Sequence, residues 1–221
     1  MPEVLFPGSA GRLEGRYTPG KSPTAPLALI LHPHPHHGGT MNSKVVYAMY
    51  NAFVERDFAT LRFNFRGVGR SQGSYDRGEG ELSDAASALD WLQSVNPNAR
   101  GRAWVAGFSF GAWIGMQLLM RRPEIGAFIS AAPPANMLDF NFLAPCPASG
   151  QIIHGAADEI VPEPSVAKLV AKISSQRGVS VDYRIIPNAG HFFADQLPEL
   201  TDCVTDYLDS VLYQKPLAGA A

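Results

Sequence analysis

The segment 104–113, WVAGFSFGAW, constrains the fold of this chain more than any other part of the sequence. An apolar run typical of a β-strand passes through the sequence GFSFG at 107–111 into an apolar run typical of a helix. A serine at so sharp a strand-to-helix turn has a strained backbone, and small residues two positions before and after it let the neighbouring chain pass. The five-residue pattern alone is weak, because a glycine-rich turn at the start of a buried helix contains the same residues. Its significance therefore depends on what the rest of the chain supplies.

Strand and helix patterns alternate along the chain. Residues 3–18 combine short strand-like pieces with glycine and proline turns, which predicts an antiparallel hairpin at the edge of a sheet. Beyond residue 26, strands are predicted at 27–31, 59–65, 102–108, 126–131, 150–154 and 181–186, and helices at 43–55, 82–96, 110–122, 165–175 and 200–211. This alternation predicts the α/β class, with a mostly parallel sheet covered by helices on both faces. Ligands of such sheets bind beyond the carboxyl ends of the strands.

Length and composition limit the class of protein. A chain of 221 residues, 46% of them apolar, is long enough for one well-buried core, so we expect a single domain over 1–221 with a frayed tail at 214–221. The net charge of −2 and the lack of basic clusters argue against nucleic-acid or membrane partners and favour a small-molecule substrate. The start does not resemble a signal peptide and no apolar run has membrane length, so a soluble, cytoplasmic protein is expected. Cys146 and Cys203 are expected to be buried free thiols, and the sequence indicates no oligomeric state.

A serine hydroxyl needs a base to become a nucleophile, and the base needs a third group that holds its tautomer. His191 and Asp158 each follow a predicted strand directly, so Ser109, Asp158 and His191 occur in the chain order serine, acid, histidine. A surface-loop histidine and a turn-forming aspartate, with Glu159 as a rival acid, are the plainer explanations. The placement of all three residues after strands favours the catalytic interpretation.

A histidine-rich stretch, HPHPHHGGT at 32–40, follows the first apolar strand. A metal site is one interpretation of its four histidines, but the prolines do not give the fixed geometry that metal ligands need, so no metal or other cofactor is expected. The alternative is an oxyanion hole, in which two backbone N–H groups face a developing negative charge. The amide of Phe110 is the expected first donor and that of His34 the expected second, because the adjacent prolines have no N–H group.

These motifs together resemble the α/β-hydrolase superfamily. The segments LHPHP at 31–35, GGTM at 38–41, RFNFRG at 62–67, GFSFG at 107–111, Asp158 and GHF at 190–192 occur in the order of that superfamily, and the match covers nearly the whole chain. Within it, the chain is similar to small bacterial hydrolases close to the dienelactone-hydrolase and carboxylesterase groups. The resemblance implies an α/β-hydrolase fold, an eight-stranded sheet with an antiparallel second strand, and a triad of Ser109, Asp158 and His191. His32-Pro33 replaces the usual His-Gly, and serine replaces the cysteine of dienelactone hydrolases, which disfavours dienelactone chemistry.

Residues 133–147 are too few for a helical lid after the sixth strand, so no large cap domain is expected and the site is expected to be open. Met137, Phe140 and Phe142 are expected to form one wall of the substrate pocket, with Phe192 close to it. The leading prediction is a serine hydrolase, a carboxylesterase that cleaves small or medium uncharged esters through an acyl-enzyme. A thioesterase or amidase with the same triad, or a non-catalytic protein of this fold that binds a ligand or partner, are the alternatives.

Overall fold

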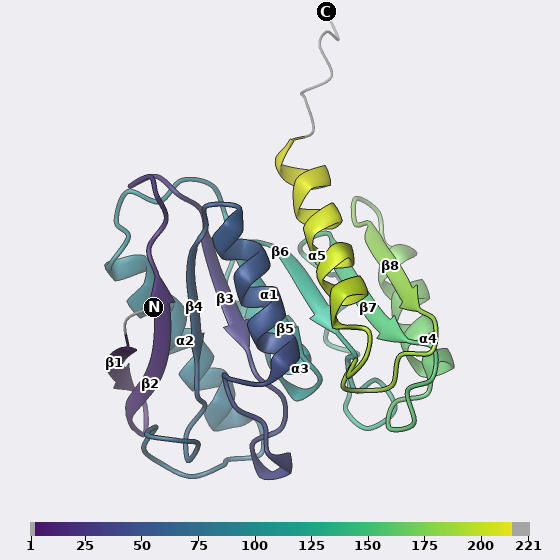
Figure 1. Cartoon of the computed structure of the whole chain (residues 1–221), viewed down its shortest axis with the longest axis horizontal. Coiled ribbons are helices and arrows are strands. Elements are labelled where there is room, and N and C mark those ends of the chain that lie inside the picture. The colour runs from purple at the N-terminus through teal and green to yellow at the C-terminus, as the bar shows by residue number, and fades with distance from the viewer. Residues whose placement is uncertain (1–2, 214–221) are drawn as a thin grey trace, which may run out of the picture.

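An eight-stranded sheet runs through the centre of the computed structural model, which describes residues 3–213 (Figure 1). The strands are β1 (Glu3–Gly8), β2 (Gly11–Thr18), β3 (Leu27–Leu31), β4 (Ala59–Phe63), β5 (Ala103–Phe108), β6 (Ile125–Ala131), β7 (Gly150–Gly155) and β8 (Val181–Ile186). They lie in the order β1-β2-β4-β3-β5-β6-β7-β8. β2 pairs antiparallel with both β1 and β4, and the other strand pairs are parallel, which confirms the mostly parallel sheet and its antiparallel second strand. The tail predicted to fray, 214–221, lies outside the described residues.

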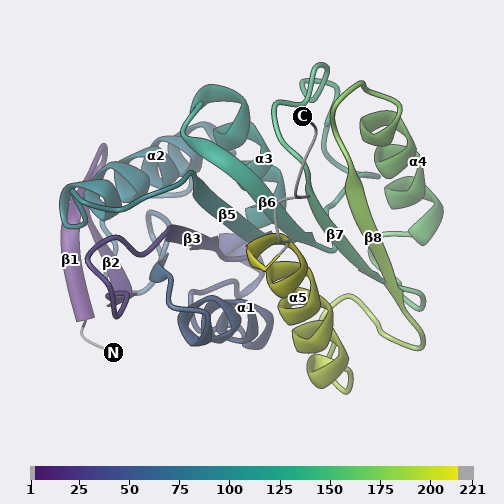
Figure 2. The same ribbon diagram turned by 90° about the horizontal axis from the view of Figure 1, so that it is seen from above.

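Helices cover both faces of this sheet. On one face lie α1 (Lys44–Glu55) and α5 (Leu197–Leu212), and on the other lie α2 (Glu79–Ser94), α3 (Phe110–Arg121) and α4 (Glu163–Ser174) (Figure 2). The layered arrangement confirms the fold class predicted from the alternating strand and helix patterns. None of the helices within residues 3–213 is long and apolar enough to cross a membrane.

Two apolar cores separate the sheet from these helices, and β3 shows how the sequence forms both. Leu27, Leu29 and Leu31 point into the core under α2 and α3, while Ala28 and Ile30 point into the core under α1 and α5. Successive side chains of a strand alternate between its faces, so a strand covered on both sides is apolar at every position. The continuous apolar run at 27–31 is therefore the signature of a central strand.

The connection between β6 and β7 contains turns but no helix or strand, and residues 3–213 form no cap domain over this edge of the sheet. Trp113 of α3 donates its Nε1–H to the carbonyl oxygen of Asp139 at 2.9 Å, which attaches the connection to the helix layer. Within the described residues, the carboxyl ends of the strands therefore open to a surface formed by loops and one short 3-10 helix, Pro35–His37.

A buried ion pair attaches α2 to the loop after β4. The Asp84 carboxylate, which is completely buried, accepts hydrogen bonds from the backbone N–H and Nε of Arg66 at 2.9 and 3.0 Å, and from Nη2 at 2.8 Å. Loss of one member of such a pair is costly because the other charge stays buried without compensation. The position of this loop therefore depends on the Asp84 carboxylate.

We expect Asp84→Asn to lower the free energy of unfolding by about 3 kcal/mol or more, because the amide keeps the shape but loses the charge and one acceptor. Urea denaturation monitored by circular dichroism measures this loss. Asp90→Asn is the matched control on the same helix, since Asp90 is exposed and bonded to Arg122 at 2.6 Å, and it should cost about 1 kcal/mol or less. Equal losses in the two variants would contradict the structural role of Asp84.

Candidate active site

Ser109 stands at the turn between β5 and α3, with φ of 53° and ψ of −118°, a conformation that residues other than glycine rarely adopt. Its N–H donates to the carbonyl oxygen of Ala131 at 2.8 Å, and its own carbonyl accepts from the first turn of α3. A Cβ atom at Gly107 would overlap the carbonyl oxygen of Gly111, and one at Gly111 would overlap that of Leu31. Both glycines therefore permit close backbone contacts, which the GFSFG motif predicts.

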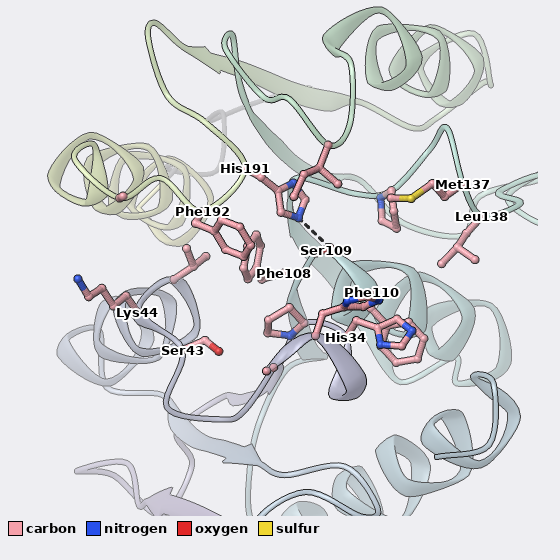
Figure 3. Close-up of a pocket in the computed structure, with 18 residues that line it drawn as sticks. His34, Ser43, Lys44, Phe108, Ser109, Phe110, Met137, Leu138, His191 and Phe192 are labelled. Carbon is pink, nitrogen blue, oxygen red and sulfur yellow. Dashed lines mark hydrogen bonds between the residues drawn. The ribbon is translucent and has the colours of Figure 1, made fainter.

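Three side chains from different loops form one hydrogen-bonded chain beyond the carboxyl ends of the strands, and Figure 3 shows the bond between two of them, His191 and Ser109. Nε2 of His191, in the loop after β8, lies 3.0 Å from Oγ of Ser109. Nδ1 of the same ring lies 2.8 Å from Oδ2 of Asp158, in the loop after β7. All three residues are buried, whereas Glu159, the rival acid, is exposed. The structure thus brings together Ser109, His191 and Asp158.

The Asp158 carboxylate sets the tautomer of His191. Burial alone would raise the pKa of Asp158, but the hydrogen bonds that it accepts from His191 and from the N–H groups of Val161 and Ile160 outweigh burial and hold its pKa below the usual value. The ionised carboxylate only accepts hydrogen bonds, so Nδ1 of His191 carries the hydrogen and the lone pair of Nε2 faces the Ser109 hydroxyl. This arrangement can take a proton from the serine hydroxyl.

His154, on β7, supports the loop that carries Asp158. It is completely buried, and its Nε2–H donates to the carbonyl oxygen of Val161 at 2.9 Å. The N–H of Val161 in turn donates to Oδ1 of Asp158 at 2.8 Å. Val161 is therefore hydrogen-bonded to both side chains, to His154 through its carbonyl oxygen and to Asp158 through its N–H. Nδ1 of His154 has no hydrogen-bond partner within the described part of the chain. The sequence shows that His154 lies four positions before Asp158, but no sequence pattern predicts its hydrogen bond to Val161.

His32, directly after β3, fixes the direction of the peptide before His34. The N–H of Phe65 donates to Nε2 of His32 at 3.0 Å, so the hydrogen is on Nδ1, which donates to the carbonyl oxygen of Pro33 at 2.6 Å. The C=O and N–H of a trans peptide point in opposite directions, so the N–H of His34 points away from the His32 ring. Among residues 3–213, neither this N–H nor that of Phe110 has a hydrogen-bond acceptor.

Both ring nitrogens of His34 are also engaged in hydrogen bonds. Nδ1 accepts from the N–H of His36 at 3.2 Å, so Nε2 carries the hydrogen and donates to the Tyr75 hydroxyl oxygen at 3.1 Å. Burial and the neighbouring imidazoles of His37 and His36 lower the pKa of His34, which keeps the ring neutral at neutral pH. In the region that the structure describes, no group of three or more His, Cys, Asp or Glu side chains is arranged to hold a metal ion.

A cavity of about 840 Å³ opens beside the serine (Figure 3). Of the four residues expected at a substrate pocket, Met137 and Phe192 line this cavity, and Phe140 and Phe142 do not. Phe140 is buried in the core on the α3 face, and Phe142 stacks on it with ring centroids 6.0 Å apart. The expected wall is therefore corrected, because these rings lose more water-exposed area by packing inward. The lining residues that sequence reasoning did not name include Pro134, Leu138, Ile160, Ser43, Lys44 and Val45.

We expect the protein to lose stability in mild acid because of His32. Burial lowers the pKa of this histidine from 6.5 to about 4, so below pH 6.5 the unfolded chain binds a proton that the folded chain refuses. The free energy of unfolding should therefore fall as the pH drops from 6.5 to 4, by about 3 kcal/mol from this group alone. Denaturant titrations at several pH values measure the slope. His32→Gln, which cannot titrate, should show a shallower slope than the wild type between pH 6.5 and 4, and identical slopes would contradict the prediction.

The sequence of this chain matches a known family model and a known relative. Residues 16–160, more than half of the chain, match the family model described as X-Pro dipeptidyl-peptidase (S15 family). An uncharacterised protein of Rickettsia prowazekii is 51% identical over 96% of this chain and 90% of its own length.

Similar proteins also occur among solved structures. A protein of unknown function from Agrobacterium tumefaciens is 59% identical, with a TM-score of 0.93 and 96% of both chains covered. A member of the α/β serine hydrolases without a lid, from Xanthomonas campestris, is 30% identical, with a TM-score of 0.85 over 97% of this chain and 96% of that one. Because the family model spans more than half of the chain and the solved structures match nearly all of it, the chain belongs to the S15 family within the α/β-hydrolase superfamily.

Proposed function

We propose that this protein is a carboxylesterase that cleaves small or medium uncharged esters. The observation that carries this proposal is the chain of hydrogen bonds from Ser109 through His191 to Asp158 beside a largely apolar cavity. The serine hydroxyl has a base within reach, the base has its tautomer fixed, and the cavity offers a place for a neutral organic group.

The reaction proceeds through an acyl-enzyme. Oγ of Ser109 attacks the ester carbonyl carbon while its proton moves to Nε2 of His191, and the Asp158 carboxylate stabilises the imidazolium that forms. When the tetrahedral intermediate collapses, the bond to the alcohol oxygen breaks and His191 returns the proton to that oxygen. Water then attacks the acyl-enzyme with His191 as its base, which releases the acid and restores the serine hydroxyl.

The backbone N–H groups of Phe110 and His34 are the proposed oxyanion hole. Phe110 begins α3, where the unpaired N–H groups of a helix favour negative charge. The N–H of His34 is directed by the hydrogen bond between His32 and Pro33. Both lack acceptors within residues 3–213, so they are free to bind the developing oxyanion without breaking an existing bond.

The charges around the cavity favour neutral esters over peptides with a free N-terminus. The ionisable side chains that line it are His34, His37, Lys44 and His191, and no aspartate or glutamate is among the described lining residues. A substrate ammonium group would lose water there without gaining a carboxylate partner. The dipeptidyl-peptidase activity named in the family description is therefore the less favoured candidate for this chain.

We expect Ser109→Ala to lower kcat for a chromogenic ester such as p-nitrophenyl acetate by about 10⁴-fold or more, because removal of the nucleophile leaves only the residual effect of binding and the oxyanion hole. Steady-state kinetics measure this loss. Ser83→Ala, which changes an exposed serine on α2, is the control and should retain wild-type activity. Unchanged turnover by Ser109→Ala would refute the assignment. Failure of a fluorophosphonate to label Ser109 in the folded protein would favour the alternative of a non-catalytic binding protein.

A panel of leaving groups tests the substrate class. We expect neutral p-nitrophenyl esters to be cleaved in a Ser109-dependent manner, and X-Pro p-nitroanilides with a free N-terminus to show no rate above that of Ser109→Ala. N-acetylated X-Pro anilides separate the effect of the ammonium charge from that of the amide bond, and thioesters extend the panel. Faster cleavage of the free X-Pro anilide than of any ester would overturn the esterase proposal in favour of a peptidase.

A further inference from the structure

We propose that one side of the cavity, formed by Pro134, Met137, Leu138 and Ile160 and called the apolar arm below, binds an unbranched apolar chain of the ester substrate. The proposal rests on the proposed function, since the ester carbonyl must lie at Ser109. It names the substrates more narrowly than that function does, as esters with an extended hydrocarbon chain on one side of the carbonyl.

The apolar arm exposes large apolar side chains to water. The exposed fraction is 57% for Met137 and 43% for Ile160, although large apolar residues are usually buried. Neighbouring exposed apolar side chains at the mouth of a cavity are typical of binding surfaces, because a ligand removes them from water. An apolar chain that continues from Ser109 across this surface would cover both residues.

Hydrogen bonds hold the apolar arm in place without a ligand. The backbone N–H groups of Met137 and Leu138 donate to the carbonyl oxygen of Pro134 at 3.1 and 2.9 Å, which forms a helical turn. Nδ2 of Asn136 donates to the carbonyl oxygen of Ile160 at 3.0 Å and thereby joins the loop after β6 to the loop after β7. A preformed apolar surface loses little entropy when it binds a chain.

The apolar arm is also fixed relative to the reacting atoms. The N–H of Ile160 donates to Oδ1 of Asp158 at 2.9 Å, so one residue contributes to the wall and holds the acid. Figure 3 shows Met137 and Leu138 on one side of Ser109, and Phe192 with Ser43 on the opposite side. A chain in the apolar arm therefore extends from the ester group in one defined direction.

The opposite side of the cavity is more polar. Besides Phe192 it includes Ser43 and Lys44, the last of which is exposed (Figure 3). A hydrocarbon chain gains more by lying against methionine, leucine and isoleucine than against hydroxyl and ammonium groups that it would separate from water. The smaller or more polar substituent of the ester is thus assigned to this second side.

Two series of soluble esters test the proposal and identify which half of the ester carries the chain. Methyl esters of acetic to hexanoic acid vary the acyl chain, and acetates of methanol to hexanol vary the alcohol. In one series, kcat/KM should rise about fourfold for each methylene that the apolar arm covers.

Met137→Asp places a charge on this surface, and it should lower the ratio of kcat/KM for the longest to the shortest ester at least tenfold. Val211→Asp changes a similarly exposed residue on α5 and should leave that ratio unchanged.

Binding to the Ser109→Ala protein provides a readout that does not require turnover. Calorimetric titration with the same esters should give dissociation constants that decrease with chain length, and Met137→Asp should weaken this dependence. If the wild type cleaves none of the esters, the proposed function fails while the titration still tests the apolar arm. Dissociation constants independent of chain length, or a Met137→Asp protein with the wild-type ratio, would overturn the proposal. A rate increase that begins only where the esters form aggregates would also overturn it, in favour of a surface that docks on lipid aggregates.

Discussion

The contact of backbone atoms between the start of α3 and the ends of β3 and β5 is the constraint on which the candidate site depends. A side chain at Gly107 or Gly111 would occupy the space of a neighbouring carbonyl group, so α3 can begin this close to the sheet only with glycine at both positions. The sharp turn gives Ser109 its φ of 53°, a conformation that costs about 1–3 kcal/mol. It persists because the hydrogen bond to Ala131 and the packed helix hold both sides of the turn. The serine hydroxyl is thereby placed where His191 reaches it.

Hydrogen bonds between loops fix the positions of further residues of the candidate site along the same edge of the sheet. His32 joins the loops after β3 and β4, and the pair of Asp158 and His191 joins those after β7 and β8. Each of these bonds has a fixed direction, because burial keeps His32 neutral by lowering its pKa to about 4, whereas accepted hydrogen bonds keep Asp158 ionised. Ser109 therefore lies between two sets of hydrogen-bonded loops, and its Oγ is already within hydrogen-bond distance of His191.

The strands and helices are predictable from the sequence because each has its own periodic signal, such as the continuous apolar run of β3 or the apolar stripe of α2. Ser109, Asp158 and His191 are predictable because each directly follows a strand. The inward orientation of Phe140 is not, since an irregular connection has no periodicity and packing against the core decides which way a ring points. The contacts of His32 are equally hidden, because hydrogen bonds between distant loops leave no characteristic spacing.

The connection between β6 and β7 shows why an uncapped site can still have a defined wall. Phe140 closes the core on the α3 face, while Met137, three positions earlier, faces the cavity. The carbonyl of Asp139, between them in sequence, is held by Trp113 of α3. The wall of the cavity is therefore an extension of the packed core rather than a separate lid. Phe140 is part of the core, whereas Met137 lies on the cavity surface with most of its side chain exposed, so a substitution at Met137 leaves the packing of the core intact.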